Sequence, residues 1–340
     1  MTRIAVPSPI SGGVFLSYRC NSRCRYCMYA CSPDWSPDWI SEEDLTRVLS
    51  QLSGKIKPSP YGSDRVSLNY GLHFTGGEPF LNFDLLLKAV EIANELEIPS
   101  TFVETNCYWC VNDEITREKL MLLKSKGLRG ILISVNPFYL EYIPFSRTER
   151  AIRISREVFK GNVMVYQVEY YFQFKELGIK GILPFDEYLK MVKPGDIQKR
   201  VELFLTGRAA YKLKDFYPKY PANYFLDKPC QPPFLRNWHN HIDNYSNYLP
   251  GYCGGLSLGD ARKLNLICKE GVDADSHPIL RFLAAGDFEG LFQFATKDFG
   301  YEERSEGYVS KCHLCLDMRK HLAKEGFEEL TPKEFYLHLE

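Results

Sequence analysis

The chain has 340 residues, of which 45% are hydrophobic and 25% are charged, and its formal net charge is −1. This length suits a large α/β unit with an appended region, and the composition is that of an ordinary globular protein. A charge so close to zero provides no field that would gather a polyanion, so nucleic acid is not an expected partner. No N-terminal run resembles a signal peptide and no apolar run could span a bilayer, so we expect a cytoplasmic chain without a membrane partner.

Hydrophobic patterning predicts strands that alternate with helices along the first two thirds of the chain. The first strand leads into a cysteine-rich loop and then into a helix whose start is marked by Ser41. Strands are predicted at 13–18, 72–75, 101–106, 130–135, 163–168 and 200–205. Further helices are predicted from 82 to 96, from Asp113 to near Gly127, and from a capping box at 146–149 to Gly161. Such alternation implies a parallel sheet with right-handed crossovers.

The composition of the sequence changes near residue 217. Prolines interrupt the chain at positions 218, 221, 229, 232 and 233, and aromatic residues crowd between Tyr211 and Tyr252. We therefore expect a core domain over residues 1–222 and a loop-rich, cysteine-containing C-terminal domain over residues 223–340. Within the second, helical segments are predicted around 278–285 and 332–339.

Three closely spaced cysteines, Cys20, Cys24 and Cys27, follow the first predicted strand. In the cytoplasm the eleven cysteines of the chain should be reduced, and clustered ones are more typical of metal ligands than of disulfides. Iron–sulfur clusters are normally held by four thiolates, so three would leave one iron open, which is a catalytic arrangement. A structural zinc site or a set of buried thiols is the alternative interpretation.

Together with the segment Thr75-Gly76-Gly77-Glu78-Pro79 on the next strand, this C-x3-C-x2-C triplet resembles the signature of the radical S-adenosylmethionine (radical SAM) superfamily. The resemblance covers roughly the first two thirds of the chain and implies a partial (β/α)6 TIM-like barrel with its chemistry at the carboxyl ends of the strands. It also implies a [4Fe–4S] cluster whose open iron binds SAM, reductive cleavage of SAM to a 5′-deoxyadenosyl radical, and an external one-electron donor of the flavodoxin or ferredoxin type.

The resemblance also implies which residues contact SAM. Tyr26 takes the aromatic position beside the adenine, and Glu78 supplies an acceptor for the methionine ammonium, while glycines let the backbone approach closely. The fixed fork of Arg208 suits a carboxylate, with a surface salt bridge as its alternative. For all candidates other than Arg208, packing or strand-end capping is the alternative interpretation. The remaining candidates are Gly76, Gly77, Thr105, Asn106, Ser134 and Asn136.

A second set of cysteines, Cys230, Cys253, Cys312 and Cys315, lies in the C-terminal third, with the last two as a C-x-x-C pair. The segment 241–255 resembles the hairpin that introduces a cysteine ligand in the SPASM and twitch extensions, which hold auxiliary iron–sulfur clusters. Only one C-x-x-C follows here, so we expect one additional metal site. A [4Fe–4S] cluster, a mononuclear iron or zinc with four thiolates, and simply reduced cysteines are the three alternatives.

The other cysteines and the histidines carry weaker expectations. Cys107 and Cys110 follow the third strand at the expected rim of the active site, where a reactive thiol or a metal ligand is conceivable beside plain buried thiols. Isolated thiols are commonly small hydrophobes, and Cys31 and Cys268 are such residues. Three histidines are expected near the second cysteine set, where packing would explain them: His239, His241 and His313.

Relatives with SPASM or twitch extensions often modify peptides, so hydrogen abstraction from a side chain of a peptide or protein is the leading hypothesis. The outcome is open between crosslinking, epimerisation, oxidation and C-methylation with cobalamin, although the chain has no Asp-x-His-x-x-Gly cobalamin motif. A small metabolite or cofactor precursor is the alternative substrate, since fold does not fix function. A non-catalytic iron–sulfur carrier or scaffold is the third hypothesis, which the Gly76-Gly77-Glu78 segment disfavours.

Overall fold

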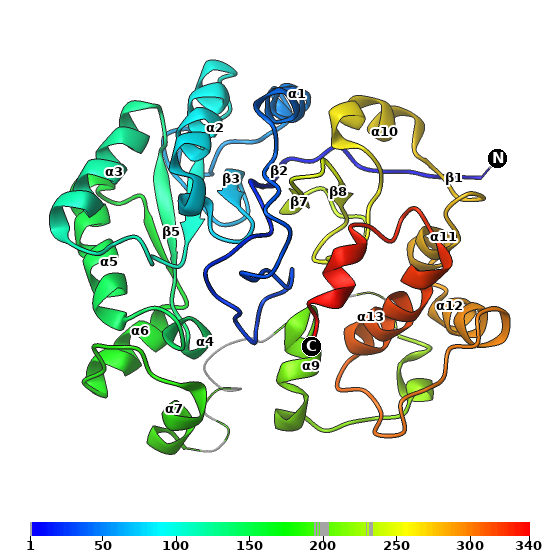
Figure 1. Ribbon diagram of the computed structural model, residues 1–340. Coiled ribbons are helices and arrows are strands. Elements are labelled where there is room, and N and C mark those ends of the chain that lie inside the picture. Colours follow the sequence, from blue (N-terminus) through cyan, green and yellow to red (C-terminus); the bar gives the residue numbers. More distant parts are fainter. Residues whose placement is uncertain (1, 194, 196, 198–203, 229, 231–233) are drawn as a thin grey trace.

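A sheet of seven strands forms the centre of the computed structural model (Figure 1), which describes residues 2–193, 195, 197, 204–228, 230 and 234–340. The order of the strands is β6-β5-β4-β3-β2-β7-β8. They are β2 (Ser11–Phe15), β3 (Gly71–Thr75), β4 (Phe102–Thr105), β5 (Gly130–Ser134), β6 (Val163–Tyr166), β7 (Asn240–Ile242) and β8 (Tyr248–Leu249). All neighbours from β6 to β7 are parallel, and only β8 runs antiparallel. A separate pair joins β1 (Arg3–Ile4) to β9 (Val272–Asp273).

Helices lie on both flanks of this sheet. Figure 1 shows α2, α3 and α5 along one side and α10 to α13 gathered on the other, beyond β7 and β8. The helices that follow strands β2 to β6 are α1 (Glu42–Leu52), α2 (Phe83–Glu95), α3 (Asp113–Ser125), α4 (Pro137–Leu140), α5 (Phe145–Phe159), α6 (Val168–Glu176) and α7 (Phe185–Met191). The later ones are α9 (Arg208–Lys212), α10 (Leu264–Glu270), α11 (Pro278–Ala285), α12 (Phe288–Gln293) and α13 (Lys311–Leu322). Across the described ranges, no helix has the length and apolar character needed to cross a membrane.

Local sequence explains where the early helices begin and which face they bury. The Ser41 side chain accepts a hydrogen bond from the amide of Asp44 at the start of α1, and Asn82 accepts one from Leu85 at the start of α2. Both helices then turn an apolar stripe toward the sheet. In α2 the buried residues are Leu85, Leu86, Ala89, Val90, Ile92 and Ala93. The predicted mixed α/β architecture, a partial barrel followed by a cysteine-containing C-terminal region, is confirmed.

One detail of the prediction is wrong, and another is tested at two of its residues only. The capping box at 146–149 does not start α5, because the helix begins at Phe145 after Pro144 and has no side-chain cap. The sixth strand was expected at 200–205, of which 200–203 lie outside the described residues, whereas Phe204 and Leu205 are in no strand. The further parallel neighbour of β2 is β7 instead, which comes from the C-terminal third.

The pairing of β2 with β7 depends on a close approach of two backbones at Gly12. The register places Gly12 opposite Asn240 and Gly13 opposite His241, so the main sheet continues past the boundary predicted at residue 222. That boundary stays a prediction. A Cβ atom added to Gly12 would lie 2.2 Å from the carbonyl oxygen of Asn240, so only glycine allows this approach.

We therefore expect Gly12→Ala to destabilise the chain by about 1–3 kcal/mol, because the added methyl group must push β7 away from β2. The free energy of unfolding in denaturant measures this effect. Gly181→Ala is the matched control, since its added Cβ would meet no atom within 4 Å. Equal stability of the two variants would contradict the tight pairing of β2 and β7.

Candidate active site

A cavity of about 180 Å³ lies at the carboxyl ends of the parallel strands. Its lining brings together residues from the cysteine loop after β2, the Gly76-Gly77 turn after β3, and the ends of β4, β5 and β6. All residues predicted for the first site line it, except Glu78 and Arg208. Those that do are Cys20, Cys24, Tyr26, Cys27, Gly76, Gly77, Thr105, Asn106, Ser134 and Asn136. The topology therefore collects in one place groups that are up to 116 residues apart in sequence, from Cys20 to Asn136.

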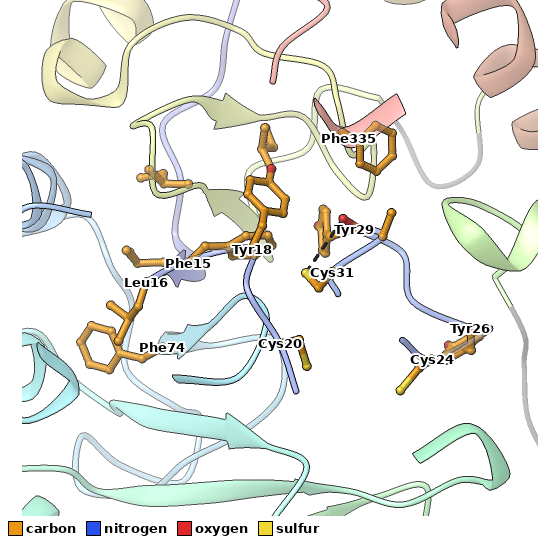
Figure 2. Packing of buried hydrophobic residues seen from close by; sticks show 14 of the residues in the cluster. Phe15, Leu16, Tyr18, Cys20, Cys24, Tyr26, Tyr29, Cys31, Phe74 and Phe335 are labelled. Carbon is orange, nitrogen blue, oxygen red and sulfur yellow. Dashed lines mark hydrogen bonds between the residues drawn. The ribbon is translucent and has the colours of Figure 1, made fainter. Parts of the chain in front are cut away.

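The cysteine loop connects β2 to α1, and Figure 2 shows Cys20 at its beginning, with Cys24 and Tyr26 further along. All three cysteines of the triplet are free thiols. The Cys27 sulfur accepts a hydrogen bond of 3.3 Å from the backbone N–H of Cys31. A hydrogen bond from the Cys31 side chain, together with the charge of Arg208, lowers the pKa of Cys27 to about 6. Burial instead raises the pKa of Cys20 and of Cys24. One of the three is therefore already disposed to be a thiolate.

The Arg208 guanidinium holds this loop from within. Its side chain is 1% exposed, and each of its five N–H groups donates to a backbone carbonyl. The acceptors are the carbonyls of Cys24, Ala30, Cys31 and His338, at 2.6–3.1 Å. The expected contact of Arg208 with a carboxylate of SAM is therefore wrong, because no donor is left for it, and so is the alternative of a surface salt bridge.

Glycines allow the Gly76-Gly77 turn to pack directly on the beginning of the cysteine loop. The N–H of Gly77 donates to the Ser17 carbonyl at 2.8 Å, and the N–H of Glu78 donates to the Arg19 carbonyl at 3.1 Å. A Cβ atom on Gly77 would lie 1.9 Å from that Arg19 oxygen. The close approach that these glycines permit is thus to the loop backbone, which fixes the loop against β3.

Glu78 joins the ends of β3 and β4 behind the cavity. Its buried carboxylate accepts a hydrogen bond from the Thr105 hydroxyl at 2.9 Å. It also accepts from the backbone N–H groups of Asn106 at 2.8 Å and of Phe80 at 3.2 Å. Burial raises the pKa of Glu78 to about 7, against the lowering effect of these donors. The carboxylate does not line the cavity, so a direct contact with a methionine ammonium stays a prediction.

Polar residues at the ends of β4 and β5 have definite partners. The Asn106 side chain donates to the Asn21 side chain at 2.8 Å and lies 3.8 Å from the Cys20 sulfur, so it orients the first cysteine of the triplet. The Asn136 side chain accepts from the amides of Phe138 and Tyr139 and caps α4. Asn136 is therefore a helix N-cap, and its contact with SAM stays a prediction. The Tyr26 ring stacks on Phe138 with 5.8 Å between the centroids.

The second cysteine set also comes together in space. Cys312 and Cys315 lie on the first turns of α13, whereas Cys253 follows the predicted hairpin, which is formed by β7 and β8. The Lys311 ammonium donates to the Cys230 sulfur at 2.9 Å. Burial, with a contribution from neighbouring thiols of the set, raises the pKa of Cys253 to about 12 and that of Cys312 to about 11. The thiols of Cys230, Cys312 and Cys315 therefore lie close enough to Cys253 to influence its pKa, as does the buried Arg319.

Sequence reasoning missed the polar floor of the cavity. His73 on β3 lies two residues before Thr75 and so shares its face, and the carboxylate of Glu104 on β4 accepts from the Thr75 hydroxyl at 2.9 Å. His239 and His241 line the main cavity, and the His239 ring lies 5.8 Å from the ring of Tyr252, the residue before Cys253, so their expected place near the second cysteine set stays a prediction. The signal was available as two histidines that alternate with Asn240 and as one histidine inside an apolar strand.

The remaining cysteines and His313 are placed as follows. Cys107 and Cys110 are fully buried, and their side chains hydrogen-bond to each other. Burial lowers the pKa of His313 to about 4, and its Nδ1 accepts from the amide of Val309 at 3.3 Å. The buried Cys31 thiol donates to the Gly76 carbonyl at 3.4 Å, which adds a further link between the loop and the turn after β3.

Replacing Arg208 with lysine should loosen the cysteine loop. Lysine has one charged nitrogen and cannot reach four carbonyls, so buried acceptors lose their partners, and we expect a loss of about 2–4 kcal/mol in the free energy of unfolding. The loop cysteines should also react faster with a small thiol reagent in the folded chain. Arg47→Lys, at an arginine whose side chain is 58% exposed, is the control and should change neither quantity. Unchanged thiol reactivity of Arg208→Lys would refute this role of the arginine.

Comparisons with known proteins agree with this geometry. Residues 14–167 match the model of the Radical SAM superfamily. The putative peptide biosynthesis protein YydG of Bacillus subtilis (strain 168) is 23% identical over 142 residues, which are 42% of this chain and 40% of that protein. The match thus spans about two fifths of the length of that relative.

Two solved structures have a similar course of the chain. One is native anSMEcpe with bound AdoMet and a Kp18Cys peptide, at 14% identity, covering 93% of this chain and 98% of that chain, with a TM-score of 0.47. The other is Streptococcus suis SuiB bound to the precursor peptide SuiA, at 14% identity, covering 90% and 76%, with a TM-score of 0.45.

The family match runs from within β2 to the residue after β6 and contains both the cysteine triplet and the Gly76-Gly77-Glu78 turn. It ends before the second cysteine set, so the resemblance of that region to a SPASM or twitch extension is not part of the match. The family implies a [4Fe–4S] cluster with SAM as the cofactors. Residues 14–167 of this chain therefore carry a radical SAM domain.

Proposed function

We propose that Cys20, Cys24 and Cys27 hold the [4Fe–4S] cluster of this enzyme and that SAM occupies the adjoining cavity, where it starts radical chemistry on a peptide. One observation carries the assignment of the site: the three thiols and the polar strand ends line the same cavity. When bound, the cluster supplies the electron that cleaves SAM to methionine and a 5′-deoxyadenosyl radical. An external flavodoxin or ferredoxin is the proposed electron donor.

The residues of this chain orient the cysteine loop and enclose the cavity. Asn106 positions the Cys20 sulfur, and Arg208 with Gly77 fixes the loop that carries the three thiols. Aromatic side chains form much of the wall and exclude water, which protects a reactive carbon centre from side reactions. The lining tyrosines are Tyr26, Tyr29, Tyr139, Tyr166 and Tyr252.

Replacing one thiol of the triplet should abolish cleavage of SAM. After anaerobic reconstitution with iron and sulfide and reduction by dithionite, we expect the native chain to form 5′-deoxyadenosine and Cys24→Ala to form at least a hundredfold less, because the cluster loses a ligand. Cys268→Ala removes a thiol outside both sets and is the matched control. Equal product from Cys24→Ala and Cys268→Ala would refute the assignment of the triplet.

The second cysteine set is proposed to hold an auxiliary iron–sulfur cluster in a C-terminal domain of residues 223–340. Four thiolates on one zinc ion at about 2.3 Å would lie about 3.8 Å from one another. Among the described residues, neither cysteine set has three sulfurs within 4.8 Å of one another. Thiolates on separate irons of a cluster lie further apart than those on one ion, so this arrangement is compatible with a cluster.

Iron content tests the second site. We expect Cys312→Ala with Cys315→Ala to lower the iron of the reconstituted chain by about four atoms, the content of one [4Fe–4S] cluster. Inductively coupled plasma mass spectrometry gives the count, with Cys268→Ala again as the control. An unchanged iron count in the double variant would remove the second cluster from the proposal.

A peptide substrate is proposed because the relative that matches this chain is named a putative peptide biosynthesis protein. The proposal is limited to hydrogen abstraction from a side chain, which crosslinking, epimerisation, oxidation and C-methylation have in common. No described residue favours C-methylation with cobalamin over the other outcomes. Small metabolites and cofactor precursors are the competing substrate class, and the following experiment separates the two.

Deuterium transfer identifies the substrate class. Perdeuterated peptides, synthesised from short reading frames next to the gene, should deliver deuterium into 5′-deoxyadenosine, which mass spectrometry detects as an increase of one mass unit. The Cys24→Ala variant with the same peptides provides the blank. Failure of every peptide, while a fraction of small metabolites from a cell extract stimulates 5′-deoxyadenosine formation, would overturn the peptide assignment and leave the radical chemistry intact.

A further inference from the structure

Three buried histidines meet beside the cavity, and two of them, His239 and His241, line it. His73 lies on β3, His241 on β7, and His239 just before β7, and one ring nitrogen of each lies within 4.8 Å of the other two. The Nε2 atoms of His73 and His241 are 3.2 Å apart. Within the part of the chain that the structure describes, no other group of three histidine, cysteine or acidic side chains is so close.

The register of the sheet creates this meeting. Gly13 on β2 pairs with His73 on one side and with His241 on the other, so the three residues form one row across the strands. A Cβ atom on Gly13 would lie 2.3 Å from His73 Nε2 and 2.8 Å from His241 Cδ2. The two imidazole rings therefore occupy the space that the missing side chain of Gly13 leaves.

The outer ring nitrogens of His239 and His241 have partners that orient the inner ones. The Nδ1 atom of His239 lies 2.9 Å from the Leu68 carbonyl, which can only accept, so Nδ1 carries the hydrogen and Nε2 keeps its lone pair. The Nδ1 atom of His241 lies 2.8 Å from the Tyr29 hydroxyl, which can accept a hydrogen bond in the same way. Such second partners are typical of histidines that bind a metal, because they fix the tautomer and the direction of the ring.

The spacing also fits a metal. Two nitrogens at about 2.0–2.1 Å from a tetrahedral zinc ion lie about 3.3 Å apart, close to the 3.2 Å between the two Nε2 atoms of His73 and His241. The carboxylate of Glu104 stands 3.6 Å from His73 Nε2 and adds a negative charge beside the three neutral rings. In addition, His239 holds a left-handed backbone with φ +51°, which non-glycine residues seldom adopt.

We propose that His73, His239 and His241 bind one divalent transition-metal ion of the zinc class, with Glu104 at its side. Three protein nitrogens leave a coordination position open, as in catalytic zinc sites. Glu104, His239 and His241 line the same cavity as the cysteine triplet, so the proposed ion would lie beside the space proposed for the substrate. A carboxylate or carbonyl oxygen of the substrate is the ligand it would take, which would fix the substrate relative to the cysteine loop. This metal site goes beyond the radical chemistry proposed above and does not depend on it.

Zinc binding by the reconstituted full chain tests the site, because filled clusters occupy the cysteines. After equilibration with Zn²⁺ and removal of loosely bound ions, we expect about one zinc per native chain and at least tenfold less in His73→Gln and in His241→Gln. His277→Gln is the matched control, since His277 lies outside the cluster and bonds through Nδ1 to the Asp273 carbonyl at 2.8 Å. Equal zinc in all four proteins would overturn the proposal.

X-ray absorption at the zinc edge of the native chain gives a second answer that needs no variant. Scattering from nitrogen or oxygen neighbours, with the outer-shell pattern of imidazole, supports the site. A first shell of sulfur would place the zinc on cysteines and refute it. Neither measurement requires SAM cleavage, so failure here is distinct from failure of the proposed peptide chemistry.

Discussion

The geometry of the active site depends on the hydrogen bonds that the buried guanidinium of Arg208 donates to backbone carbonyls. A cysteine loop of this kind has no regular hydrogen-bond ladder of its own, so its backbone carbonyls need donors from elsewhere. Arg208, at the start of α9, supplies five, and through His338 it also ties the loop to the C-terminal residues. The three thiols therefore stay at the carboxyl ends of the strands, although they lie on a single irregular loop.

Close backbone packing completes this arrangement. Gly77 lets the turn after β3 touch the loop, Gly207 lets the chain before Arg208 touch it at Met28, and Gly12 brings β7 against β2. Each contact is one that a side chain would block, since an added Cβ would lie 1.9–2.2 Å from a carbonyl oxygen in all three. The loop is thus held by the hydrogen bonds of Arg208 and by the close backbone contacts at Gly77 and Gly207. Beside it, β7 from the C-terminal third pairs with β2.

Much of the fold and of the cysteine sites follows from local sequence. Periodic apolar stripes and capping residues such as Ser41 and Asn82 locate α1 and α2, and the spacing of Cys20, Cys24 and Cys27 marks the cysteine loop that lines the cavity. Local sequence does not show which residues interact when they lie far apart in the chain. Nothing near Arg208 states that its acceptors are loop carbonyls, and nothing near His241 states that β7 pairs with β2 opposite His73. The histidine floor therefore emerges only from the register of the sheet.

Electron–nuclear double resonance on the reduced Cys312→Ala, Cys315→Ala protein examines the cluster on the triplet directly, because the second cysteine set can then contribute no cluster. With SAM labelled by ¹³C in its carboxylate, we expect a hyperfine coupling between the label and the reduced cluster, since the open iron left by three thiolates must bind SAM through its amino and carboxylate groups. Absence of that coupling, while equilibrium dialysis shows SAM bound to the same sample, would contradict a cluster with an open iron on Cys20, Cys24 and Cys27.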